Sequence, residues 1–157
     1  METVYLANLI KRAVTGPMWH GAALNELLTG VTSEQAAARP IPGAHSIWEI
    51  VLHVTAWAEI ARARIHGERL LEPPTEQDWP PVRGTSASDW SAAVDRLRES
   101  YRTLAHDVRH LEDIHLHEKI QGLDYSASNL LHGVVEHGTY HGGQIALLKK
   151  ATAPAGR

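Results

Sequence analysis

The chain has 157 residues, 43% hydrophobic and 21% charged, a balance that predicts a single globular domain over residues 1–157 with a sizeable hydrophobic core. A formal net charge of -3, with no concentrated run of Lys or Arg, argues against a nucleic-acid partner, because phosphate binding needs a positive surface. Cysteine is absent, which excludes disulfides and thiolate ligands, so any metal site must use nitrogen and oxygen donors.

The first predicted helical segment covers residues 4–14, where apolar side chains recur at helical spacing. A second stretch, residues 19–28, follows the break at Gly16 and Pro17, and we interpret the two as one interrupted helical arm. Charged residues lie inside the first stretch, and no apolar run reaches the roughly 20 residues of a transmembrane helix. We therefore expect neither export nor membrane insertion, and a cytoplasmic protein.

The next segments carry clear helix start signals. Residues 32–38 form a short predicted helix that stops before a proline, since the residue before proline disfavours helical geometry. In "SIWE", Ser46 stands three residues before Glu49, which is the spacing of a capping box. This signal predicts a second long helix that runs to about residue 66.

Residues 67–88 are rich in Pro, Gly and Ser, and we expect neither helix nor central strand there. About 20 extended residues can span up to about 66 Å, whereas the preceding helix should be about 30 Å long. The segment can therefore cross the whole molecule and begin the third helix parallel to the second.

The third helix is predicted from about residue 88 to 110, and the last from Ser126 or Ser128 to Lys150. We interpret residues 111–126 as a connection, because the strand-like alternation of "IHLHEKI" has no partner strand. Four principal helices without a convincing sheet predict an all-α fold, a four-helix bundle.

Three histidines on these helices could share one ion. His137 and His141 are four residues apart, so they project from the same face of the last helix, and His53 lies in the apolar run "IVLHVTAW" of the second. If these helices are antiparallel neighbours, the three rings meet at similar height. Three ligands would leave a coordination position open, as in catalytic sites. The alternatives are an exposed pair and a core histidine hydrogen-bonded to backbone.

Glycines and polar residues surround these candidates. Gly133, Gly138 and Gly142 each cost about 1 kcal/mol relative to alanine in a helix, so we expect a neighbouring helix or a ligand to approach them closely. Close helix packing without any function is the alternative.

Four further side chains are candidates for supporting roles. We predict His20 as an acid/base group or a hydrogen-bond partner near the metal, with a surface position as the alternative. Trp57, one turn after His53, is a candidate pocket wall, and His45 could line the mouth of the cleft. Gln144 could hydrogen-bond a ligating ring, a water or a ligand.

The stretches "SIWEIVLHVTAW" and "LLHGVVEHGTYHGGQIALLKK" resemble the DinB-like superfamily of metal-binding four-helix bundles. The resemblance implies an up-down-down-up bundle with a long crossover between helices 2 and 3, and frequently a homodimer. It implies a divalent cation, zinc or nickel, on His53, His137 and His141. Some similar proteins, the mycothiol- and bacillithiol-dependent enzymes, use the metal to activate a low-molecular-weight thiol; one of them has a carboxylate where His137 stands here.

Together, these observations predict a metal-dependent enzyme of the thiol S-transferase or hydrolase type. Its metal would activate a water or a thiol toward a small-molecule substrate. The alternative is a non-catalytic module, a metal-dependent ligand binder or structural dimer, in which the ion only ties two helices together.

Overall fold

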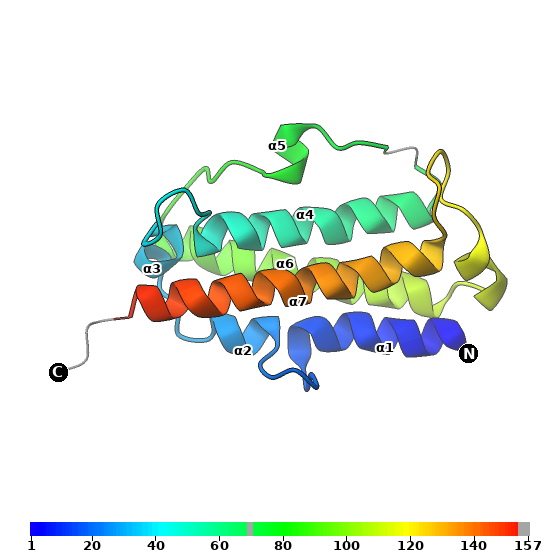
Figure 1. Cartoon of the computed structure of the whole chain (residues 1–157), viewed down its shortest axis with the longest axis horizontal. Helices are drawn as coiled ribbons and strands as arrows, with labels where there is room; N and C mark the ends of the chain where they lie inside the picture. Colours follow the sequence, from blue (N-terminus) through cyan, green and yellow to red (C-terminus); the bar gives the residue numbers. More distant parts are fainter. Residues whose placement is uncertain (69–70, 154–157) are drawn as a thin grey trace.

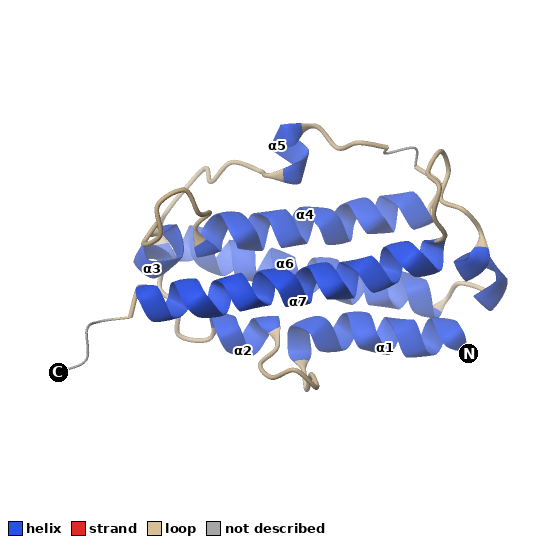
Figure 2. Ribbon diagram, in the orientation of Figure 1, coloured by secondary structure: helices blue, strands red, loops and turns tan. Residues whose placement is uncertain are grey.

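The computed structural model describes residues 1–68 and 71–153, and over these ranges the chain is all-helical, with loops and two isolated β-bridges but no strand (Figures 1 and 2). The expected all-α class is confirmed. The long helices lie side by side in Figure 1: α1 (Glu2–Thr15), α4 (Ile47–Ile65), α6 (Ala87–Arg109) and α7 (Ala127–Ala151). The short ones are α2 (Leu24–Leu28), α3 (Ser33–Ala37), α5 (Thr75–Asp78) and the 3₁₀-helix η1 (Asp113–His117).

The long helices enclose one continuous hydrophobic core. α6 packs against α1 and α4, and α7 packs against α4 and α1. Each long helix contributes fully buried apolar side chains, and removing such a side chain from water stabilises a fold by about 1.5–3 kcal/mol. This packing holds one face of α4 against one face of α7. Core residues exposed by 1% or less include Leu6, Ile10, Ile47, Val51, Leu97, Leu104, Leu131 and Ile145.

Capping side chains fix where α4 and α7 begin. The Ser46 hydroxyl accepts a hydrogen bond from the Glu49 backbone amide at 3.2 Å, and the Glu49 carboxylate accepts one from the Ser46 amide at 2.8 Å. The predicted capping box is therefore confirmed. The Ser126 hydroxyl accepts from the Asn129 amide at 3.2 Å at the start of α7. Such caps contribute about 1 kcal/mol each and set the rotation of every later side chain on the helix.

Two predictions of local structure were wrong. Residues 19–28 were expected to be helical throughout, but the helix begins only at Leu24. Gly16 turns the chain out of α1 at φ 69, a conformation that favours glycine. The chain then forms a loop over residues 17–23. The crossover was expected to contain no helix, but it contains α5. This short helix forms because the Pro74 carbonyl accepts hydrogen bonds from the amides of Gln77 and Asp78, which closes one helical turn. The predicted connection after α6 contains η1.

Within the described ranges, no helix combines the length and the apolar character that crossing a lipid bilayer requires.

Candidate metal centre

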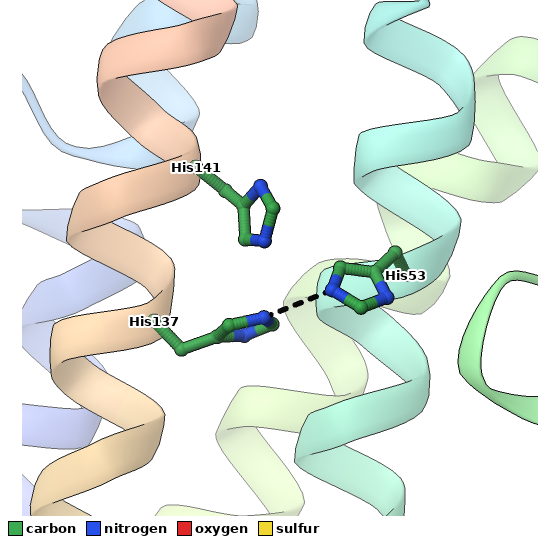
Figure 3. A group of neighbouring side chains, drawn as sticks. All are labelled: His53, His137 and His141. Atoms are coloured by element: carbon green, nitrogen blue, oxygen red, sulfur yellow. Dashed lines mark hydrogen bonds between the residues drawn. The ribbon is translucent and has the colours of Figure 1, made fainter. Parts of the chain in front are cut away.

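Three imidazoles from two helices converge in the structure. His53 projects from α4, and His137 and His141 project from successive turns of α7 toward it (Figure 3). One nitrogen from each ring can be chosen so that all three lie within 4.8 Å of one another. The Nε2 atoms of His53 and His137 are 2.9 Å apart. Zinc–nitrogen bonds of about 2.0–2.1 Å set the ligands of a tetrahedral site roughly 3.3 Å apart, so the cluster has the dimensions of a metal site.

Hydrogen bonds at the outer ring nitrogens orient two of these side chains. His53 Nδ1 lies 2.6 Å from the backbone carbonyl oxygen of Asp78, and His141 Nδ1 lies 2.7 Å from the side-chain oxygen of Gln144. Because both oxygens can only accept, each Nδ1 must donate. The Nε2 atom of each ring is then left with a lone pair, which is the form that binds a metal.

His137 completes the cluster, with its Nε2 atom close to His53 and its other ring nitrogen unpaired among the described residues. Its Nδ1 is buried, with no hydrogen-bond partner among the described residues. Burial, and then the neighbouring rings of His141 and His53, lower the pKa of His137 to about 3. Burial also lowers the pKa values of His53 and His141. All three rings are therefore neutral at pH 7, as metal ligation requires, and an ion would compensate for the cost of burying them.

The crossover supplies a support that the sequence analysis missed. α5 and the residue after it lie against α4, where the Trp79 ring is stacked between His53, at 3.8 Å between ring centroids, and His45, at 3.6 Å. The Asp78 carboxylate accepts a hydrogen bond from the Trp57 indole nitrogen at 2.7 Å. Asp78 and Trp79 thus hold the outer side of the cluster. The one feature of the sequence that could have indicated this support is the presence of an acidic and an aromatic residue inside a proline-rich loop.

A cavity of about 630 Å³ opens beside two of the three rings, those of His53 and His137. His53 and His137 form one end of it, and its walls are largely apolar. This volume falls within the range of about 300–1,000 Å³ that is typical of small-molecule sites. The remaining lining residues are Trp57, Asp78, Tyr125, Asn129, Leu130, Gly133 and Val134.

The sequence profile of one family, described as the DinB superfamily, matches residues 19–145, a range that contains all three histidines. The chain belongs to the DinB superfamily. Comparisons with curated proteins and with solved structures gave no significant match. The family, the three-histidine cluster and the cavity are therefore the observations from which a function for this DinB-superfamily chain can be argued.

The glycines of α7 have different neighbours in this DinB-superfamily protein. A Cβ atom at Gly138 would lie 2.9 Å from the Tyr101 hydroxyl, and one at Gly142 would lie 3.3 Å from the side chain of Leu27. These two glycines therefore permit close packing of α7 against its neighbours. Gly133 lines the cavity, and a Cβ there would meet nothing within 4 Å.

His20 and His45 lie apart from the three-histidine cluster. His20 is exposed in the loop between α1 and α2, where it lines a separate cavity with Gly138 and Gly142. The helical arm does not resume until Leu24, and His20 is not among the residues that line the cavity beside His53 and His137. His45 stacks on the Trp79 ring, which also stacks on His53.

Proposed function

We propose that this DinB-superfamily chain binds one divalent cation, zinc or nickel, through His53, His137 and His141. The proposal rests on the convergence of three neutral imidazoles. In two of them, His53 and His141, the Nδ1 atom already donates a hydrogen bond to a protein oxygen. Three protein ligands leave a coordination position for a water, a thiol or a substrate, which is typical of catalytic rather than structural sites.

The proposed activity is that of a metal-dependent transferase or hydrolase. A bound divalent ion supplies a Lewis acid that lowers the pKa of a water or of a low-molecular-weight thiol. His53 and His141 are held in position by Asp78 and Gln144. The apolar walls of the cavity, including Trp57, would enclose a small electrophilic substrate and reduce its contact with water.

Elemental analysis of untagged protein after dialysis tests the metal site. We expect about one zinc or nickel ion per chain in the native protein and loss of stoichiometric metal in His141→Ala, because two imidazoles hold an ion weakly. His132→Ala is the matched control, since His132 is an exposed histidine of α7 that lines none of the cavities described above. Full metal retention in His141→Ala would rule out the site.

A non-catalytic role is the second candidate. The 2.9 Å separation of His53 and His137 across α4 and α7 favours it, because an ion placed there would also tie two core helices together. Thermal unfolding with and without chelator, combined with thiol-transfer and hydrolysis assays, separates the candidates. A large stabilisation by the metal, with no turnover across a broad substrate panel, supports the non-catalytic role.

The finer arrangement of the chain belongs to the same proposal. An up-down-down-up four-helix bundle is supported by the colour order of Figure 1, in which α4 and α6 both run away from α3 while α1 and α7 run toward it. A single domain over residues 1–157 is supported by the continuous core. A homodimer is proposed from the family alone, and a cytoplasmic location from the sequence features described above.

A further inference from the structure

The cavity beside the three histidines has two chemically different ends. His53 and His137 form the first end, together with the Asp78 carboxylate, which lies 3.3 Å from His53 Nδ1. The second end is formed by Tyr125 and Asn129. Asn129 precedes His137 by eight residues on α7, which places it about 12 Å along the helix axis.

The second end presents hydrogen-bond donors. The Tyr125 hydroxyl oxygen accepts from the Arg64 guanidinium at 2.9 Å, so its own proton is available, and no acceptor for that proton lies within the described part of the chain. Accepting from a cation polarises the hydroxyl and strengthens it as a donor. The side-chain oxygen of Asn129 faces the Ser126 hydroxyl at 3.4 Å, which leaves the Asn129 amide protons free to donate.

A buried positive charge stands behind this end. The Arg64 side chain is 3% exposed, donates to the Leu71 carbonyl at 2.8 Å, and lies over the Trp57 ring at 5.5 Å from its centroid. Arg64 therefore supports both the Tyr125 hydroxyl and one cavity wall. The histidine end is the end that would hold the metal, so the two ends differ in the groups they offer a ligand.

The stretch between the two ends is apolar. Trp57, Leu130 and Val134 supply its walls, and Gly133 leaves room in the middle, because a Cβ at this position would meet nothing within 4 Å. A flat hydrocarbon or aromatic group fits such a passage better than a charged one, because apolar walls offer charges no compensation.

We propose that the cavity selects elongated small molecules with a reactive head at the three histidines, a flat apolar middle over Gly133, and a terminal carboxylate bound by Tyr125 and Asn129. This inference rests on the proposed metal site and names the substrate class for it. Tyr125 and Asn129 are then specificity-determining residues that set the orientation of the substrate.

Three probes of about this length test the proposal on zinc-loaded protein by isothermal titration calorimetry. Each carries a hydroxamate head on a phenyl ring, and the para substituent is a propionate, a propyl group or an aminoethyl group. We expect the propionate probe to bind at least about tenfold more tightly than the propyl probe, because hydrogen bonds to a charged group carry that much affinity. The aminoethyl probe should bind most weakly.

Variants locate the effect. In Tyr125→Phe or Asn129→Ala, the propionate-to-propyl affinity ratio should fall toward one, whereas in the control His132→Ala it should stay at the native value. Removal of the Tyr125 hydroxyl could disturb Arg64, which donates to it. Asn129→Ala avoids this problem, because the Asn129 side chain is exposed and its removal should leave the fold unchanged. A ratio near one in native protein, or a ratio that survives both variants, overturns the proposal.

Zinc content measured on the same samples shows whether the substrate class or the proposed metal site has failed. Stoichiometric zinc with equal affinities for the propionate and propyl probes overturns the substrate class alone. Native protein without zinc overturns the metal site and the substrate class together.

Discussion

Replacement of Gln144 by leucine tests whether the outer hydrogen bonds of the cluster matter. Gln144→Leu keeps the size of the side chain but removes the oxygen that lies 2.7 Å from His141 Nδ1. His141 is 5% exposed, so its Nδ1–H would lose an acceptor that water cannot easily replace. Loss of such a partner weakens metal affinity about 10- to 100-fold, which corresponds to about 1.4–2.7 kcal/mol.

Competition for zinc against a chromophoric chelator measures this change directly. Gln144→Glu is the matched control, because a carboxylate at the same position still accepts from His141 Nδ1, and its zinc affinity should stay at or above the native value. Circular dichroism of the metal-free variants should show unchanged helix content. Equal zinc affinity of Gln144→Leu and native protein would refute the assigned role of this hydrogen bond.

Three other properties follow from the same geometry. Trp79→Ala removes the ring stacked on His53 and should weaken zinc binding roughly three- to tenfold in the chelator competition; an unchanged affinity would contradict a supporting role for Trp79. Gly133→Ala should raise the free energy of unfolding in urea by up to about 1 kcal/mol, because a methyl group there meets nothing within 4 Å. Gly138→Ala should lower the free energy of unfolding, because the added methyl would lie 2.9 Å from a buried tyrosine hydroxyl. A Gly138→Ala variant more stable than Gly133→Ala would show that the packing is misassigned. The pKa of His137 falls from 6.5 to about 3 on folding, so the metal-free folded state binds fewer protons than the unfolded state. The free energy of unfolding should therefore have its full value above pH 6.5 and decrease as the pH falls from 6.5 toward 3. Urea titrations in chelator that show no such decrease would contradict a neutral, buried His137.

Helices and short-range patterns were predictable because their causes are local. The Ser46 and Glu49 capping box spans four residues and sets the start of α4, as the sequence indicated. The four-residue spacing of His137 and His141 places them on one helix face whatever the surroundings, and the structure brings both to His53. Their role as metal ligands remains a prediction.

Long-range contacts of the loops were not predictable. The Asp78 carbonyl reaches His53 across 25 positions of sequence, from a segment with no periodic pattern. Residues 17–23 leave helical geometry after Gly16, so the extrapolation that carried His20 toward the cluster had no continuous helix to follow. The glycines indicated close approach on α7, but only the packed structure shows that Gly138 meets Tyr101 while Gly133 lines the cavity.

The stacking of Trp79 on His53 gives the protein an intrinsic optical reporter. Indole emission responds to the ring in contact with it, so a change in the charge or bonding of His53 alters the fluorescence of Trp79 without an attached dye. Trp57, whose indole nitrogen donates to Asp78, lines the cavity itself and reports on its contents. Because the chain has five tryptophans, the fluorescence change that is lost in Trp79→Phe would report on the cluster, and the change that is lost in Trp57→Phe would report on the cavity.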